Sequence, residues 1–380
     1  MPETLSILAL EAFYGGSHRD FLDGLTRHSR HSFALLTLRD QFWKWRMRGS
    51  ALHFLERMRG MRPDLILTGS MTSAADLQAL MPLALGRRVP LVYYAHETQL
   101  DYPVAMGEKR DRAFGFLNVT SMLASDAVLF NSQTHLDRFL ETLPGFLSAM
   151  PDAHPLWTVD AIREKAEVQH PGVDVRAIQA IPRSVPDGPP IVLWNHRWEH
   201  DKNPQEFFRA LFRLDDEGLP FRLAILGENY VEGPPIFAEA KARFGDRILY
   251  WGYLPSRTAY YEALRRSDIV VSTARQENFG LSVVEAMAAG CHPILPKRLS
   301  YPELLPEHAR DQVLFPNHRG LVERLREALT SPGARLDLSA EMARFDWSRR
   351  ARAFDDRFRE IYQKFAFLPS QGASSWQDGQ

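Results

Sequence analysis

Short apolar runs recur along the chain, and a segment with the spacing of an amphipathic helix follows most of them. Strands that are apolar on both faces belong to parallel sheets whose two faces are covered by helices. The pattern occurs once in each half of the chain, and it therefore predicts an α/β protein with two Rossmann-like, doubly wound domains. The expected strands are residues 5–11, 33–38, 64–68, 90–96 and 127–131 in the first half and residues 191–195, 221–226, 248–251, 268–273 and 293–296 in the second.

A proline-rich stretch separates the two halves. Residues 146–190 show no sustained helical or strand period, so we expect irregular structure that ends in a linker. This places a first domain at residues 1–185 and a second domain at residues 186–345. A helix over residues 346–368 is expected to pack back toward the first domain. Residues 369–380 are poor in apolar side chains and are expected to be a disordered tail.

The composition excludes several classes of protein. The 380 residues carry a net charge of −1, so any contact with nucleic acid needs a local basic patch. Cys291 is the only cysteine, which excludes a disulfide framework and a cysteine-based zinc site. The N-terminus lacks the basic segment of a signal peptide, and no apolar run approaches the ~18 residues of a membrane span. We therefore expect a cytoplasmic protein that makes no membrane contact.

The stretch from residue 273 to residue 287 carries the clearest sign of a binding site. It runs from a buried strand into a helix, with Glu277 in the loop, Gly280 at the helix start and Glu285 inside the helix. Free N–H groups and the helix dipole at such a start suit a phosphate. Glu285 lies among apolar neighbours, where a carboxylate needs hydrogen-bond partners, such as two hydroxyls of a ribose. An exposed loop with a surface glutamate is the alternative, but this burial favours a nucleotide-sugar site.

Two cations follow the first strand of the second domain. Arg197 and Lys202 lie in one loop that leads into a helix beginning at Pro204. A guanidinium fork and an ammonium group together suit a diphosphate. The alternative is a pair of surface cations neutralised by Glu199 and Asp201. Because ligands of doubly wound sheets bind beyond the carboxyl ends of the strands, the position favours the functional interpretation.

The first domain has two polar segments at the corresponding edge of its sheet. Gly15-Gly16 lies between a strand and a helix and would let the backbone approach a phosphate or a sugar, although most such turns hold no ligand. His96-Glu97-Thr98-Gln99 follows a buried strand; a core histidine is the alternative, but four consecutive polar residues favour a site. No His/carboxylate cluster at metal-ligand spacing occurs in the sequence. We therefore expect no required metal or cofactor, with the cations and the helix dipole neutralising a leaving diphosphate.

These features resemble the retaining GT-B glycosyltransferases, and several longer strings resemble the tRNA-queuosine α-mannosyltransferase family. The strings are residues 11–18 (EAFYGGSH), 96–100 with 102–104 (HETQL and YPV), 196–202 (HRWEHDK) and 251–255 (WGYLP). The likeness covers roughly residues 5–310. It implies the GT-B fold, in which two Rossmann-like domains face each other across a cleft, with the acceptor on the first domain and the donor on the second.

The resemblance also implies a reaction: mannose would move from GDP-mannose to the cyclopentene hydroxyl of queuosine in a tRNA anticodon, of the tRNA-Asp type. His96 and Glu277 would act at the reacting sugar. The leaving phosphate would accept the acceptor's proton, so that no protein nucleophile is needed. Donor binding would fall to the glycine loops, the two cations and the ribose-binding carboxylate, namely Gly15, Gly16, Arg197, Lys202, Asn278, Phe279, Gly280, Leu281 and Glu285. Acceptor binding would fall to polar residues of the first domain, namely Ser17, His18, Glu97 and Gln99.

A tRNA partner needs a basic surface, and residues 39–62 offer one. They contain seven Lys or Arg and two Asp or Glu, a net charge of +5, with Phe42, Trp43 and Trp45 among them. Aromatic rings stack on unpaired bases and cations bind phosphates. The alternative, that both tryptophans belong to the core, is at least as common for such a composition. The cations that we expect to bind the tRNA are Lys44, Arg46 and Arg48, with residues 109–112 as the second choice.

Two other functions fit the same residues. A GT-B enzyme that acts on a lipid or a glycan would share the donor site. A non-catalytic module that binds tRNA or a nucleotide would share the fold. The presence of Glu277 and Glu285 together with Arg197 and Lys202 favours an enzyme.

Overall fold

The computed structural model describes residues 3–100, 102–103, 110–184, 186–228 and 234–367. Within these residues the chain forms two six-stranded sheets, with the strand orders β2-β1-β3-β4-β5-β6 and β12-β11-β10-β7-β8-β9. All the strand pairs in both sheets are parallel. This confirms the predicted pair of doubly wound α/β domains. The predicted disordered tail at residues 369–380 lies outside the described residues.

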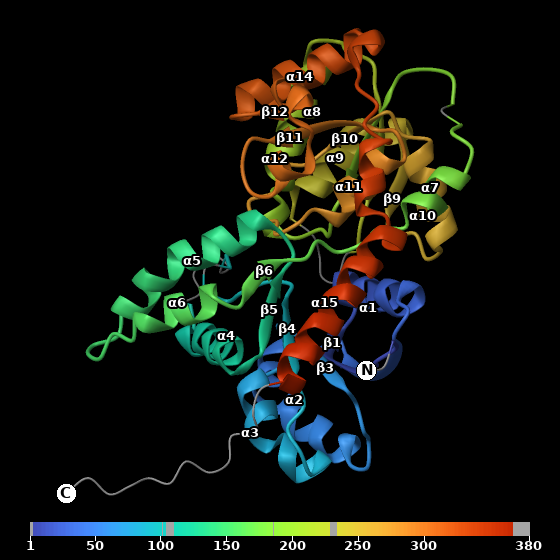
Figure 1. The fold of residues 1–380 in the computed structure, drawn as a ribbon. Coiled ribbons are helices and arrows are strands. Elements are labelled where there is room, and N and C mark those ends of the chain that lie inside the picture. The colour runs from blue at the N-terminus through green and yellow to red at the C-terminus, as the bar shows by residue number, and fades with distance from the viewer. Residues whose placement is uncertain (1–2, 101, 104–109, 185, 229–233, 368–380) are drawn as a thin grey trace, which may run out of the picture.

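The first sheet and its helices occupy the N-terminal part of the chain (Figure 1). The strands are β1 (Ser6–Tyr14), β2 (Ser32–Arg39), β3 (Leu65–Gly69), β4 (Leu91–Ala95), β5 (Ala127–Phe130) and β6 (Ala166–Val168). The helices are α1 (Gly16–His28), α2 (Trp43–Met58), α3 (Ala74–Leu85), α4 (Arg112–Ala124), α5 (Gln133–Ser148) and α6 (Trp157–Arg163).

The second sheet follows the same plan. Its strands are β7 (Ile191–Asn195), β8 (Arg222–Leu226), β9 (Ile248–Gly252), β10 (Ile269–Val271), β11 (His292–Pro296) and β12 (Leu314–Phe315). The α-helices are α7 (Val175–Ala180), α8 (Pro204–Asp216), α9 (Ile236–Phe244), α10 (Arg257–Arg265), α11 (Leu281–Ala288), α12 (Tyr301–Leu304), α13 (Arg310–Val313), α14 (His318–Thr330) and α15 (Trp347–Phe367). Short 3₁₀ turns are η1 (His200–Lys202), η2 (Gly245–Arg247), η3 (Glu307–Ala309), η4 (Pro332–Ala334) and η5 (Glu341–Phe345). No helix in the described part of the chain combines the length and the apolar character needed to cross a bilayer.

The central strands of both sheets are buried on both faces. In β1, Ile7 and Leu8 are fully buried in two different hydrophobic clusters, one on each side of the sheet. In β7, Leu193 and Trp194 are divided between two clusters in the same way. Successive side chains of a strand point to opposite faces, so each sheet has a helical layer on both sides. This burial explains the apolar runs in the sequence.

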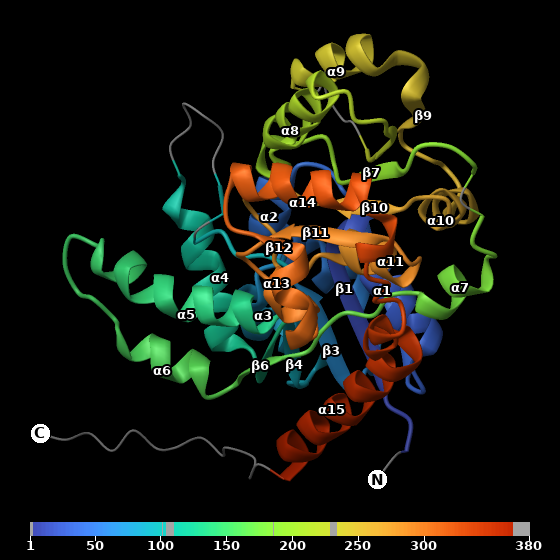
Figure 2. The same cartoon turned by 90° about the horizontal axis from the view of Figure 1, so that it is seen from above.

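Helix α15 returns from the second domain to the first and lies beside α1 (Figure 1 and Figure 2). Trp347 and Phe354 pack with Phe21 of α1 in the cluster on one face of the first sheet. A Cβ atom added to Gly24 would lie 2.1 Å from the Trp347 ring, and one added to Gly172 would lie 2.2 Å from it. The ring therefore fits against two stretches of backbone where no side chain has room.

The stretch between the domains is more ordered than predicted. Helix α5, with Pro144 inside it, continues to Ser148, and α6, β6 and α7 follow where we expected irregular structure. These three elements have seven, three and six residues, too few to establish a hydrophobic period. Val175 and Ile178 of α7 pack in the core of the second domain. That core therefore begins upstream of the boundary expected at residue 185.

The loops beyond the carboxyl ends of the strands meet where the two domains touch. The Asn278 side chain, from the loop after β10, donates to the carbonyl oxygen of His96, after β4, at 3.0 Å. Ser132, after β5, donates its hydroxyl to the carbonyl oxygen of Asn278 at 2.5 Å. Glu303 of α12 accepts from the backbone N–H of Gln133 at 2.9 Å. The polar edges of the two sheets are thus brought together, which is where doubly wound folds bind their ligands.

Candidate active site

Lys202 and Glu277 lie together on the second-domain side of this junction. The Lys202 Nζ atom is 3.4 Å from a Glu277 carboxylate oxygen and 3.3 Å from Asp201, and it donates to the carbonyl oxygen of Gln276 at 2.9 Å. Lys202 is only 8% exposed. Burial disfavours its charge, but Glu277 and Asp201 outweigh burial and raise its pKa above the usual value. From the sequence we assigned Lys202 and Glu277 to two separate motifs. In the structure their side chains form an ion pair.

Arg197 lies at the exposed end of the same loop. Its guanidinium is 3.1 Å from the carboxylate of Glu199. Burial of the group is again outweighed, by the charge of Glu199 and by a hydrogen bond with Tyr102, so the pKa of Arg197 is raised. Tyr102 comes from the first domain, and we had assigned it no role of its own from the sequence. The pairings with Glu199 and Asp201 that we considered as the alternative are therefore present, and Lys202 faces a third carboxylate, that of Glu277.

Glu285 is buried within α11, as its apolar neighbours predicted. It is 8% exposed and accepts from the Tyr260 hydroxyl at 2.9 Å. Its other oxygen lies 3.6 Å from Arg257. Burial raises the pKa of Glu285 to about 7, although Arg257 and Tyr260 act to lower it. Tyr260 and Arg257 were missed, because they lie inside an ordinary amphipathic helix with no spacing that marks them.

The loop before α11 has the form expected for an anion site. Gly280 precedes the helix with φ of 103°, and an added Cβ would lie 3.1 Å from Leu304. The first N–H groups of any helix lack partners within that helix. Phe279 is buried against Phe345, which anchors the loop, and Leu281 is half-buried. We expected Asn278 to bind the donor, but its side chain donates instead to the backbone of His96 in the first domain.

The Gly15-Gly16 turn forms the start of α1 on the opposite side. Gly15 is buried, and an added Cβ would lie 2.0 Å from the Asp40 carboxylate, so a side chain has no room there. Gly16 and Ser17 are exposed. The turn thus presents backbone to the surroundings, and the Asp40 side chain packs against Gly15.

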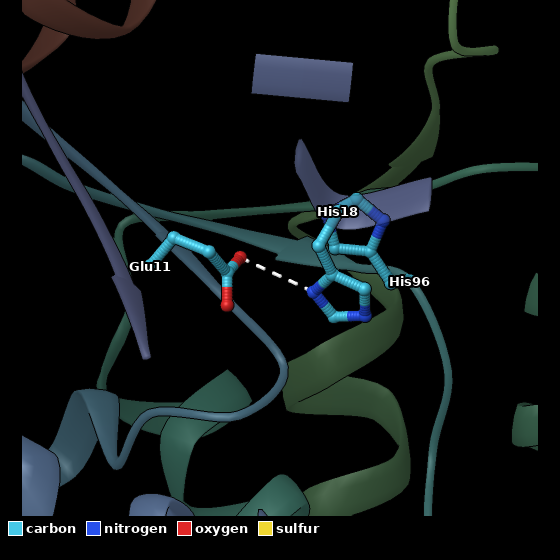
Figure 3. A group of neighbouring side chains, drawn as sticks. All are labelled: Glu11, His18 and His96. Atoms are coloured by element: carbon cyan, nitrogen blue, oxygen red, sulfur yellow. Dashed lines mark ion pairs between the residues drawn. The ribbon is translucent and has the colours of Figure 1, made fainter. Parts of the chain in front are cut away.

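His18 lies between two carboxylates in the first domain. Its Nδ1 atom is 3.2 Å from Glu11 and its Nε2 atom is 3.1 Å from Glu97 (Figure 3 shows Glu11, His18 and His96). Although burial disfavours the charged ring, the two carboxylates raise the pKa of His18 to about 10. Glu97 also accepts from the Ser70 hydroxyl at 2.5 Å, and despite its burial the charge of His18 lowers its pKa to about 2. His18 is therefore a buried imidazolium between the carboxylates of Glu11 and Glu97.

His96 stacks on this imidazolium. The two ring centroids are 4.0 Å apart with an interplanar angle of 25°. Burial, followed by the charge of His18, lowers the pKa of His96 well below the usual value. His96 is therefore neutral, and its ring can donate or accept a hydrogen bond according to its tautomer.

Glu11, His18 and His96 also each offer one ligand atom within 4.8 Å of the others, which is a spacing that could hold a metal ion. However, both nitrogens of His18 already face carboxylates, and a histidine must be neutral to bind a metal. The arrangement suits a proton on His18 better than a metal ion. Glu11 was not singled out from the sequence, because it lies inside the strand β1.

The remaining predicted residues lie around this centre. Gln99 is held by its backbone N–H, which donates to Asn118 at 2.8 Å. Lys44 and Arg48 are exposed on α2, where the Arg48 guanidinium lies 5.0 Å from the Phe114 ring centroid. Arg46, on the same helix, is half-buried. Of the second-choice patch at residues 109–112, Lys109 lies outside the described residues.

Comparison with known proteins shows which families this chain is similar to. The family model described as the tRNA-queuosine alpha-mannosyltransferase N-terminal domain matches residues 6–173, and that of glycosyl transferases group 1 matches residues 177–345. A tRNA-queuosine alpha-mannosyltransferase of Drosophila melanogaster is 36% identical over 312 residues, which cover 79% of this chain and 82% of the relative. A 2-deoxystreptamine glucosyltransferase of Streptomyces kanamyceticus is 30% identical over 106 residues, 27% of each chain.

Solved structures share the fold. Sucrose-phosphate synthase from Thermosynechococcus elongatus superposes with a TM-score of 0.71 at 16% identity, covering 94% of this chain and 100% of that one. The Anabaena protein HepE, in complex with UDP and glucose, superposes with a TM-score of 0.65 at 15% identity, covering 96% and 100%. These likenesses, with the group 1 match, confirm the predicted GT-B architecture and a glycosyltransferase.

Proposed function

This chain belongs to the tRNA-queuosine alpha-mannosyltransferase family, and we propose that it transfers mannose from GDP-mannose to a cyclopentene hydroxyl of queuosine in a tRNA anticodon, as in tRNA-Asp. One observation carries the proposal on the structural side. Glu277, which pairs with Lys202, is followed directly by Asn278, whose side chain donates a hydrogen bond to the backbone carbonyl of His96. The residues assigned to the diphosphate, the sugar and the reacting centre therefore come from distant segments and converge at one place.

The donor would occupy the second-domain side. Glu285 would accept hydrogen bonds from the two ribose hydroxyls, as a buried carboxylate with oxygens on Tyr260 and Arg257 can do when it is ionised. Lys202 and Arg197 would bind the diphosphate, with the free N–H groups at the start of α11. These groups supply positive charge where negative charge develops on the leaving diphosphate, so we propose a reaction that needs no metal ion or cofactor.

The reaction would proceed with retention at one face of the sugar. The bond between the mannose C1 atom and the diphosphate oxygen breaks, and a bond from C1 to the acceptor oxygen forms on the same face. The acceptor hydroxyl gives its proton to the leaving phosphate. Glu277 would bind mannose hydroxyls, and the neutral ring of His96 would hydrogen-bond the reacting sugar.

The acceptor would approach from the first domain. Ser17, exposed at the start of α1, and the segment from His96 to Gln99 would contact the modified base. Lys44, Arg46 and Arg48 of α2 would bind phosphates of the anticodon arm. A tRNA acceptor fits the cytoplasmic location expected from the sequence.

The proposal is tested by incubating the protein with GDP-mannose and tRNA that either contains or lacks queuosine. We expect mannose to appear only on the queuosine-containing tRNA. Replacing GDP-mannose by UDP-glucose or GDP-glucose tests the donor, and both should be poor substrates. Equal transfer to both tRNAs, or transfer only to a lipid or glycan acceptor, would overturn the assignment. Glu277→Gln should abolish transfer while GDP still binds, and if it transfers normally the role of Glu277 is wrong.

A further inference from the structure

We propose that Phe42 and Trp45 form a stacking platform for unpaired bases of the tRNA acceptor, beside the residues that hold the modified base. This inference rests on the proposed function, because it takes the acceptor to be tRNA. It assigns a role to two aromatic side chains that neither the donor site nor the set of phosphate-binding cations uses.

The structure separates the three aromatic residues of this segment. Trp43 packs inward on Phe114, with ring centroids 5.0 Å apart. Phe42 and Trp45 face outward and are 69% and 77% exposed. They lie one turn apart, since the N–H of Trp45 donates to the carbonyl oxygen of Phe42 at 2.8 Å. The alternative of two core tryptophans therefore holds for Trp43 alone.

Phe42 has an unusual backbone conformation. Phe42 immediately precedes α2 with φ of 58°, in the left-handed region that bulky residues rarely occupy. No side-chain hydrogen bond caps the helix at this position. Such strain is typical of functional positions, although it does not by itself identify the ligand.

The platform lies close to the acceptor side of the site. Arg39, at the end of β2, pairs with Tyr14 at the end of β1. The next residue, Asp40, packs directly behind Gly15. Phe42 is thus two residues from a contact with the turn that carries Ser17 and leads to His18.

The charge around the platform suits a polyanion. Residues 39–62 carry a net charge of +5 while the whole chain carries −1. Lys44 and Arg46 flank Trp45 in sequence, and Lys44 and Arg48 are exposed. Cations beside exposed rings bind the phosphates that flank a stacked base.

The distribution of apolar residues on α2 favours RNA over a membrane surface. The helix already uses its apolar face inside the protein, where Met47, Ala51, Phe54 and Met58 are buried. A helix that lies in a membrane needs a free apolar face opposite its basic face. The outward apolar side chains Phe42, Trp45 and Leu52 are instead interleaved with the exposed cations Lys44 and Arg48, as in surfaces that bind single-stranded nucleic acid.

The test compares the full chain with Trp45→Ala, Phe42→Ala and Arg48→Ala, using tRNA with and without queuosine. The matched control is Trp157→Ala, which removes a tryptophan of α6 that is 66% exposed outside the basic segment. Stacking contributes about 1–3 kcal/mol per base, so Trp45→Ala should weaken tRNA binding by roughly 5-fold to 150-fold. Its dependence on salt should not change, because no charge is lost. Arg48→Ala should instead reduce the slope of log affinity against log salt by about 0.7–0.9.

The outcomes separate this inference from the proposed function. The binding of tRNA is measured without GDP-mannose. The test of the platform therefore still applies if the protein fails to transfer mannose. GDP affinity and transfer to free queuosine nucleoside should be unchanged in Trp45→Ala. If Trp45→Ala binds tRNA as well as Trp157→Ala does, the platform is wrong. Loss of binding to phosphatidylserine vesicles with tRNA binding intact would also overturn it, and would identify a membrane surface instead.

Discussion

The guanidinium of Arg257 lies 3.6 Å from the carboxylate of Glu285, and it also lies 3.4 Å from Asp20. Asp20 belongs to α1 of the first domain, whereas Glu285 belongs to the helix assigned to the ribose. One side chain therefore joins the donor site to the opposite domain. In the proposed function Glu285 accepts hydrogen bonds from the ribose, and an ionised carboxylate accepts them more strongly than a protonated one. The charge of Arg257 beside Glu285 would then affect donor binding.

Replacing Arg257 with Gln should shift the pH dependence of donor binding. Burial raises the pKa of Glu285 to about 7, and Arg257 opposes that rise. Without the guanidinium the pKa should rise further. GDP affinity of the wild type should fall as the pH drops through about 7, and that of Arg257→Gln should fall at a higher pH. Calorimetric titration with GDP across the neutral range measures both curves, with Arg266→Gln, at the exposed residue that follows α10, as the control. Coincident curves would show that Arg257 does not set the charge of Glu285.

Replacing Glu285 with Gln should raise stability and abolish transfer. The folded-state pKa of about 7 lies above the ordinary 4.5, so the folded protein binds the extra proton between these values. The ionised carboxylate therefore costs stability increasingly as the pH rises through this window, by up to ~3 kcal/mol. Urea unfolding should show Glu285→Gln gaining stability over the wild type at and above neutral pH, and little below about pH 4.5. Glu239→Gln, an exposed change on α9, should show no such trend. A gain that is independent of pH would contradict the assignment.

Replacing Lys202 with Met should weaken GDP binding and leave guanosine binding unchanged. The Nζ atom is held by Glu277 and Asp201 in the free protein and would turn to the diphosphate in the complex. A hydrogen bond to a charged group contributes about 1.5–3 kcal/mol, so the loss in GDP affinity should be of that order. Arg275→Met, which removes an exposed cation of the neighbouring loop, is the control. An equal loss for guanosine and GDP would indicate disturbance of the fold rather than loss of a phosphate contact.

The parts of the site that could be predicted are those set by local sequence and strand order. Gly280 and Glu285 lie in one strand–loop–helix unit, and the rule for the carboxyl ends of parallel strands places Arg197 and His96 each at the carboxyl edge of its own sheet. The short, continuous apolar runs of the strands, alternating with helical segments, predicted the fold. These inferences needed no knowledge of which distant residues touch.

The parts that could not be predicted depend on contacts between separate elements. The ion pairs of His18 join residues of β1, α1 and the loop after β4, and nothing in their spacing indicates that they meet. The contact of Arg257 with Asp20 crosses the domains. Short elements such as β6, with three half-buried residues at a sheet edge, carry too little pattern to be found. The exposure of Trp45 beside the buried face of α2 was equally undetermined, because an aromatic residue fits both the core and a binding surface.

Replacing His18 with Gln should destabilise the protein by an amount that depends on pH. The folded-state pKa of His18 is raised to about 10 from the usual 6.5, because Glu11 and Glu97 outweigh burial. Its stabilising contribution is therefore fully present below about pH 6.5 and is lost as the pH rises through about 10. Removing one partner of a buried ion pair costs about 3–5 kcal/mol, so the loss should be of this order at neutral pH.

Urea unfolding over this pH range measures the difference between wild type and His18→Gln. Adding Glu97→Gln to His18→Gln should recover part of the loss, because it removes one of the two carboxylates left without a cation. His154→Gln, at an exposed histidine, should match the wild type throughout. If the difference stays constant from neutral to alkaline pH, His18 is not the imidazolium that holds Glu11 and Glu97 together, and the neutral state of His96 beside it needs another cause.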